Sequence, residues 1–96
     1  MLKHVVFFKF KKDAREADIV GAVNGLKALP GIIAEIRSFE CGLDVVHSER
    51  SFDFALVSAF DNLDAMQRYQ VHPAHQAAAK RMRDLSDSVF AVDFEL

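Results

Sequence analysis

The densest group of chemically reactive side chains lies between positions 69 and 75, where the sequence reads Tyr-Gln-Val-His-Pro-Ala-His. Two imidazoles and a phenol surround a single proline. A histidine titrates at about pH 6.5, so it can act as a base near neutrality. His75 could remove a proton next to a carbonyl group, and the hydroxyl of Tyr69 could donate a hydrogen bond to the oxyanion that develops.

Pro73 determines how these side chains are arranged. The residue before a proline is disfavoured in the α region, so a helix that contains Tyr69 should end near His72. Pro73 suits the first position of a new helix, because its missing N–H would have no partner there. His72 then lies at the N-cap and His75 in the first turn, and Tyr69 and His75 are expected to face each other across the break.

Each candidate residue also has a structural explanation. Tyr69 and His75 could hydrogen-bond each other and lock the break between the helices. His72 is interpreted first as a helix cap. His4 lies on a predicted strand among apolar neighbours, where it lines a cavity or lies at a dimer seam. Met82 follows His75 by two helical turns, so both should share the inward side of their helix.

The elements that position these residues alternate between strand and helix patterns. A capping-box-like Asp13-Ala14-Arg15-Glu16 predicts the start of the first helix, and Pro30-Gly31 predicts its end. The second helix is predicted in two pieces, from about residue 62 to the break and from Pro73 to about 87. Apolar and β-branched runs predict strands over residues 3–10, 33–44, 52–60 and 89–94.

This β-α-β-β-α-β order predicts one domain over residues 1–96. Two right-handed crossovers of this size give a ferredoxin-like α+β fold, an antiparallel sheet with its helices on one face. The other face should be polar, yet both faces carry apolar side chains in the first, third and last strands. Burying such a face is strongly favourable. We therefore expect a homodimer in which two sheets pack together.

Composition restricts the partners. The chain has 96 residues, 51% of them hydrophobic and 27% charged, with a formal net charge of −2. No basic stripe is present to neutralise phosphates, and no apolar run has the length of a membrane span, so neither nucleic acid nor a membrane is an expected partner. Cys41 is the only cysteine. An intrachain disulfide is therefore impossible, and a cytoplasmic location is expected.

The opening strand, Lys3–Phe10, and the run Tyr69-x-x-His72-Pro73-x-His75 resemble the stress-responsive A/B barrel domain family, also called Dabb or dimeric α+β barrel proteins. The resemblance covers essentially the whole chain. It implies a homodimer whose two four-stranded sheets form a shared α/β barrel, with a cavity in each protomer between sheet and helices. Most members have no assigned reaction, but a plant polyketide-cyclase branch performs a cofactor-free aldol-type cyclisation.

The resemblance also implies roles for single residues. Tyr69 and His75 correspond to the proposed catalytic pair of the cyclase branch, and His4 corresponds to its first-strand histidine. Phe54 stands where that branch has a further cavity histidine. The ligand-binding residues predicted for this chain, beside the catalytic pair, are His4, Phe54, His72 and Met82.

No metal site and no cofactor are predicted. His72 and His75 are three residues apart, but the helix break disturbs their spacing and no cysteine or carboxylate cluster completes a ligand set. Three functions remain open. The first is a homodimeric domain that binds a small apolar or aromatic metabolite. The second is a cofactor-independent polyketide-cyclase-like enzyme, isomerase or lyase, and the third is a structural stress or assembly protein.

Overall fold

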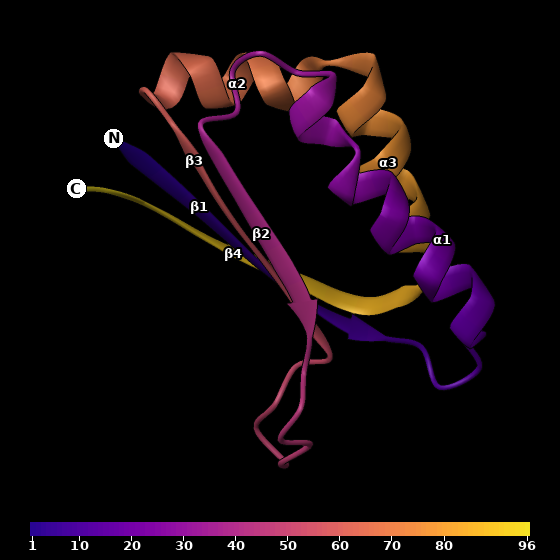
Figure 1. The fold of residues 1–96 in the computed structure, drawn as a ribbon. Coiled ribbons are helices and arrows are strands. Elements are labelled where there is room, and N and C mark those ends of the chain that lie inside the picture. Colours follow the sequence, from indigo (N-terminus) through magenta and orange to yellow (C-terminus); the bar gives the residue numbers. More distant parts are fainter.

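A computed structural model describes residues 1–96 as a four-stranded antiparallel sheet with helices on one face (Figure 1). The strand order is β2-β3-β1-β4, as a ferredoxin-like fold requires. This confirms the predicted α+β fold. The elements are β1 (Leu2–Phe10), α1 (Glu16–Lys27), a 3-10 turn η1 (Leu29–Gly31), β2 (Ser38–Leu43), β3 (Phe54–Phe60), α2 (Leu63–Val71), α3 (Pro73–Asp84) and β4 (Ser86–Glu95).

Three predicted boundaries were wrong. The capping box does not form, because α1 begins after Arg15 and no side chain caps it. The second strand begins at Ser38 rather than at Ile33, which is buried as the apolar anchor of a loop. The last strand begins at Ser86, three residues earlier than predicted, because Ser86 already pairs with Phe10 of β1.

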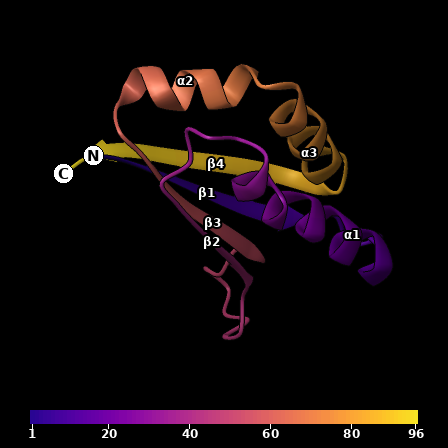
Figure 2. The same cartoon turned by 45° about the horizontal axis from the view of Figure 1, so that its top comes forward.

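The hydrophobic core lies between the sheet and the helices. Figure 2 shows that α1, α2 and α3 all lie on the same side of the sheet, with α1 and α3 side by side. Antiparallel pairing places Leu2, His4, Val6 and Phe8 of β1 on this side, in agreement with the alternation of the sequence. The other large buried side chains come from all three helices, from β3, and from η1 and the loop after it, which contribute Leu29 and Ile33.

The opposite face of the sheet carries no helix. Its side chains are largely apolar, and several of them are exposed, as predicted from the sequence: Val5, Phe7, Ala55, Val57, Phe90, Val92 and Phe94. We call this surface the outer face. An exposed apolar face of this extent is unusual for a soluble monomer. None of the helices is both long enough and apolar enough to cross a membrane.

Candidate functional site

The break between α2 and α3 forms as the proline predicts. His72 has extended backbone angles (φ −65°, ψ 132°) between the two helices, and Pro73 is the first residue of α3. The Nδ1 atom of His72 accepts a hydrogen bond from the backbone N–H of Ala74 at 3.1 Å. The structure therefore confirms His72 as the N-cap of α3.

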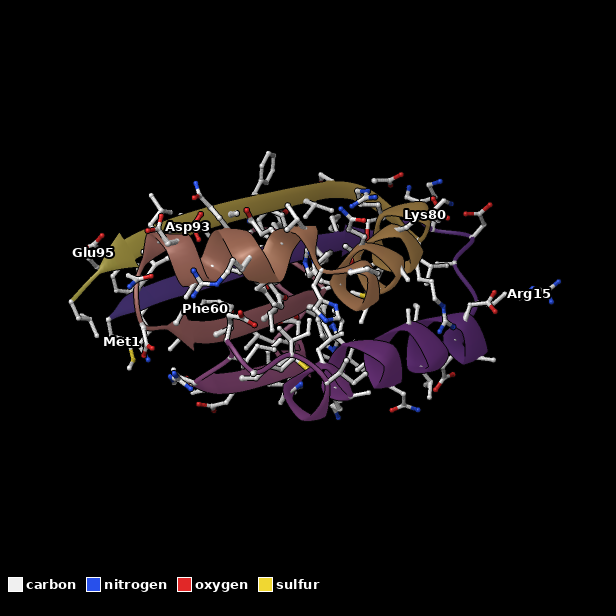
Figure 3. All side chains as sticks on the ribbon, turned by 90° about the horizontal axis from the view of Figure 1, so that it is seen from above. Met1, Arg15, Phe60, Lys80, Asp93 and Glu95 are labelled. Atoms are coloured by element: carbon white, nitrogen blue, oxygen red, sulfur yellow. The ribbon has the colours of Figure 1, made fainter.

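The break brings Tyr69 and His75 together, with 4.2 Å between their ring centroids. Phe60, at the end of β3, also packs against Tyr69, with 4.8 Å between the ring centroids. His4 of β1 completes the group, with its ring centroid 6.3 Å from that of Tyr69. We call these four residues the Tyr69 cluster. Seen from above, α2 lies between the positions of Phe60 and Asp93 and runs in roughly the same direction as the strands (Figure 3).

The hydroxyl of Tyr69 is buried and has no hydrogen-bond partner in the protein. The whole residue is inaccessible to solvent. Burial raises the pKa of Tyr69 well above its ordinary value of 10.0, so the phenol stays protonated. A buried donor without a partner costs free energy, and it is rare in native proteins. The expected alternative, a hydrogen bond that locks Tyr69 to His75, is not formed.

His75 is oriented by the backbone of α2. Its Nδ1 atom lies 3.1 Å from the carbonyl oxygen of Gln70. A carbonyl can only accept, so Nδ1 carries the proton and Nε2 is left with a free lone pair. Burial lowers the pKa of His75 below its ordinary value of 6.5; the hydrogen bond to Gln70 raises the pKa and so opposes this effect, and His4, Arg83 and His72 lower it. His75 is therefore neutral at pH 7, in the state that a base requires.

His4 is held by a residue that sequence reasoning missed. The Nδ1 atom of His4 is hydrogen-bonded to the carboxylate of Asp93, its direct neighbour on β4. The carboxylate is the acceptor, so Nδ1 of His4 carries a proton. The alternation of the last strand could have indicated Asp93, because it places this acidic residue on the same side of the strand as Val89 and Ala91.

Two other predicted ligand-binding residues, Phe54 and Met82, do not belong to the Tyr69 cluster. Phe54 begins β3 and Phe60 ends it, so Phe54 lies at the far end of the strand from the Tyr69 cluster. There its ring packs against the rings of Phe8 and Phe10. Met82 of α3 is fully buried and belongs to the same hydrophobic core as Tyr69.

Metal-binding side chains are not gathered at this site. The structure contains no group of three or more His, Cys, Asp or Glu residues close enough together to hold a metal ion. Cys41 faces the core from β2 and is partly buried, and burial raises the pKa of its thiol. The polar groups at the site are thus two imidazoles, a phenol and one carboxylate.

Comparison with known proteins gives these residues a context. The profile of the stress-responsive A/B barrel domain matches residues 2–96. The chain belongs to the stress-responsive A/B barrel domain family. It is 36% identical over 97 residues to an uncharacterized protein of Streptomyces coelicolor, with 99% of each chain covered. It is 24% identical over 95 residues to olivetolic acid cyclase of Cannabis sativa, with 97% of this chain and 94% of the cyclase covered.

A solved structure supports the fold and the oligomeric state. The chain is similar to a dimeric protein of unknown function and ferredoxin-like fold from Bacteroides fragilis, with a TM-score of 0.85 and 36% sequence identity. The match covers 99% of this chain and 95% of the other. A homodimer is thus the state that the family context supports for this stress-responsive A/B barrel domain.

Proposed function

We propose that this A/B barrel domain is a homodimer that binds a small apolar or aromatic metabolite at the Tyr69 cluster. The main support for this proposal is the buried hydroxyl of Tyr69, which has no hydrogen-bond partner in the protein. A ligand with an apolar body and one oxygen acceptor would satisfy this donor and be surrounded by aromatic rings. Because the rings of the cluster are in contact, such a ligand enters only when these side chains rearrange.

The variant Tyr69→Phe tests this proposal. It removes the hydroxyl and keeps the ring, so it should leave the free energy of unfolding unchanged or raise it by about 1 kcal/mol, since an unsatisfied buried group is lost. Ligand affinity should fall about tenfold, the value of one hydrogen bond to a buried donor. The probes are a panel of aromatic ketones. Native mass spectrometry first examines the purified protein for a bound ligand, and calorimetry then measures the affinity for each ketone.

Val71→Ala is the matched control, because Val71 lies on the same helix and is exposed. It should bind the panel as the wild type does. Equal affinity of Tyr69→Phe and wild type would overturn the proposed role of the hydroxyl. A clear loss of stability in Tyr69→Phe would assign the residue to the structure of the helix break instead.

A second candidate function is cofactor-independent catalysis, as a cyclase, isomerase or lyase. The observation that favours it is the state of His75, which is neutral, has a free Nε2 and lies beside a protonated phenol. In this reaction Nε2 of His75 removes a proton next to a substrate carbonyl, and the hydroxyl of Tyr69 donates a hydrogen bond to the enolate oxygen. His4, fixed by Asp93, is the other donor or acceptor within the cluster.

Deuterium exchange tests catalysis without knowledge of the natural substrate. Incubation of the ketone panel in D₂O should show exchange next to the carbonyl, and His75→Gln should abolish it while the dimer persists. The exchange rate should decrease as the pH falls, with an apparent pKa below 6.5, because burial lowers the pKa of His75. Equal exchange in His75→Gln and wild type would exclude His75 as the base and leave the binding function.

The proposed dimer packs the outer faces of two sheets together. Its support is the apolar character of this face and the dimeric similar structure from Bacteroides fragilis. A structural or assembly role, the third function considered, predicts particles larger than a dimer. Light scattering of the purified protein at micromolar concentration separates the outcomes: a dimer mass supports the proposal, a monomer contradicts it, and larger particles favour assembly.

A further inference from the structure

α2 is joined to the rest of the chain by one extended residue at each end. Asn62 precedes it with φ −163° and ψ 179°, and His72 follows it with φ −65° and ψ 132°. Each of these residues caps the helix after it. Oδ1 of Asn62 accepts a hydrogen bond from the N–H of Ala65 at 2.9 Å, and His72 caps α3. Because α2 and α3 are capped separately, α2 can change its orientation without unwinding either helix.

Few side chains hold α2 against the sheet. Ala65, Met66 and Tyr69 are its buried residues, and the other residues of the helix are exposed. On one flank, Nε of Arg68 donates a hydrogen bond at 3.2 Å to the carboxylate of Glu35, in the loop between η1 and β2. We call this ion pair the latch. Exposed ion pairs contribute little to stability because water screens them, so the latch is weak.

The other flank of α2 faces β4, whose helix side is uncovered. Val89, Ala91 and Asp93 lie on that side, because they alternate along β4 and pair with core residues of β1. All three are nevertheless exposed. Figure 3 shows β4 beside α2 rather than beneath it. We call these three residues the β4 strip. A side chain carried by α2 therefore has room to move over this strip.

We propose that α2 is a lid on the Tyr69 cluster, which rolls on Asn62 and His72, opens the latch and admits the ligand beside the β4 strip. This inference rests on the proposed binding at the Tyr69 cluster and adds how the ligand reaches it. The unpartnered hydroxyl of Tyr69 is carried by α2 itself, so a roll of the helix moves it from the core toward the strip. A buried donor without a partner also makes the closed state less favourable, which makes opening easier.

The lid also carries the group that orients His75. The carbonyl oxygen of Gln70, in the last turn of α2, lies 3.1 Å from Nδ1 of His75 in α3. A roll of α2 breaks this hydrogen bond, and closure restores it. His75 is thus oriented only while α2 is closed, so ligand entry and proton transfer belong to different positions of the same helix.

Amide hydrogen exchange tests the lid without any ligand. The amides of α2 should exchange about tenfold or more faster than those of β1, at a rate that low urea concentrations leave unchanged, because a local opening exposes little surface. Tyr69 is the only tyrosine. Its acetylation by N-acetylimidazole, followed by peptide mass spectrometry, should be equally independent of urea. If both rates increase with urea as the exchange of β1 does, α2 opens only by global unfolding and the lid is wrong.

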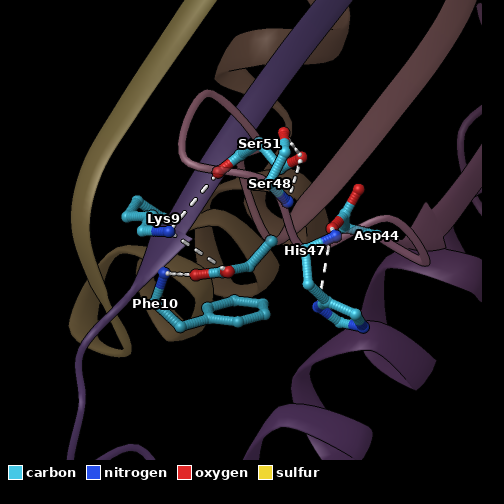
Figure 4. A network of polar contacts seen from close by, with 7 residues as sticks. Lys9, Phe10, Asp44, His47, Ser48 and Ser51 are labelled. Atoms are coloured by element: carbon cyan, nitrogen blue, oxygen red, sulfur yellow. Dashed lines mark hydrogen bonds and ion pairs between the residues drawn. The ribbon is translucent and has the colours of Figure 1, made fainter.

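Charge reversal tests the latch. Arg68→Glu replaces an attraction by a repulsion beside Glu35, so the exchange of α2 should accelerate about three- to tenfold. Glu35→Arg combined with Arg68→Glu restores opposite charges and should return the exchange to the wild-type rate. Lys9→Glu is the matched control, because Lys9 lies 3.5 Å from Asp53 in an ion pair near the end of β1 (Figure 4). An equal effect of Arg68→Glu and Lys9→Glu on α2 would contradict the latch.

Two exposed alanines on opposite flanks of α2 test the route of entry. Ala91 belongs to the β4 strip, whereas Ala34 lines a groove of about 170 Å³ beside the latch. Ala91→Leu narrows the proposed entrance and should lower the association rate constant of the aromatic ketones about tenfold, and Ala34→Leu should not. Stopped-flow fluorescence of Tyr69 measures these rates, since the chain has no tryptophan. Association in Ala91→Leu as fast as in Ala34→Leu would overturn entry beside β4.

The same measurements separate the lid from the binding function on which it rests. If α2 opens locally but the ketones bind equally to the wild type and to Tyr69→Phe, the proposed role of the hydroxyl in binding is overturned and the lid is supported. If the wild type binds the ketones more tightly but α2 opens only by global unfolding, binding is supported and the lid is overturned.

Discussion

At the scale of single residues, the Tyr69 cluster combines a phenol and an imidazole whose protonation states are set by burial. Burial raises the pKa of Tyr69 and lowers that of His75, so both groups are uncharged at neutral pH. Asp93 adds the one carboxyl group of the site through its hydrogen bond to His4. At neutral pH Tyr69 therefore keeps its proton while Nε2 of His75 keeps its lone pair.

The lowered pKa of His75 predicts how stability depends on pH. The unfolded chain binds a proton at an ordinary pKa of 6.5, and the folded chain binds it only at lower pH. Between these values the unfolded state carries more protons, so stability is full above pH 6.5 and decreases as the pH falls. Urea unfolding at pH 7.5 and at pH 5 should show a smaller difference for His75→Gln than for the wild type.

His47→Gln is the control for this experiment, because His47 is an exposed histidine in the loop between β2 and β3. It should keep the pH dependence of the wild type. If His75→Gln keeps it as well, another group is responsible for the acid sensitivity.

Sequence reasoning reached part of the site. Tyr69, His72 and His75 were predicted because the effect of a proline on its neighbours is local. Asp93 was missed because its partner His4 lies on a strand near the other end of the chain. The unpartnered hydroxyl of Tyr69 is a property of three-dimensional packing, and no spacing in the sequence indicates it.

At the scale of elements, α1 and α3 pack closely through a glycine. A Cβ atom added to Gly21 would lie 2.8 Å from Nη2 of Arg81. Arg81 is exposed, so its guanidinium group can move away. The approach of the two helices is therefore limited by a flexible side chain rather than by backbone.

Gly21→Ala should consequently stabilise the protein. Alanine is favoured over glycine within a helix by about 0.5–1 kcal/mol, and the displacement of Arg81 subtracts only part of this gain. In an Arg81→Ala background, the full gain should appear. Urea unfolding at one fixed protein concentration measures both. A loss of stability in Gly21→Ala alone would mean that Arg81 cannot move.

The elements show where local patterns stop being informative. β1 and β3 were predicted within two residues because their alternation continues along the strand. Ile33 misled the prediction of β2, because a single buried apolar residue in a loop resembles the start of a strand. The early start of β4 depends on its pairing with β1, which is a long-range contact.

At the scale of the whole molecule, the stability of a dimer depends on its concentration. If folding and association are coupled, each tenfold increase in protein concentration should raise Tm by about 3–4 °C for two chains of this size. Differential scanning calorimetry over two decades of concentration measures this. Val92→Asp should lose the dependence, and a wild-type Tm that is independent of concentration would contradict coupled folding and dimerisation.

The position of β4 has a consequence for solubility. β4 lies at the edge of the sheet, and its segment Ser88–Val92 contains no charge. A short, uncharged, β-prone segment on an open edge can template the growth of aggregates. Asp87 and Asp93 flank it and act as gatekeepers whose charges oppose stacking of chains. Because Asp93 also orients His4, a variant such as Asp93→Asn changes both, and it should be less soluble than the wild type when the soluble fractions of freshly expressed protein are compared.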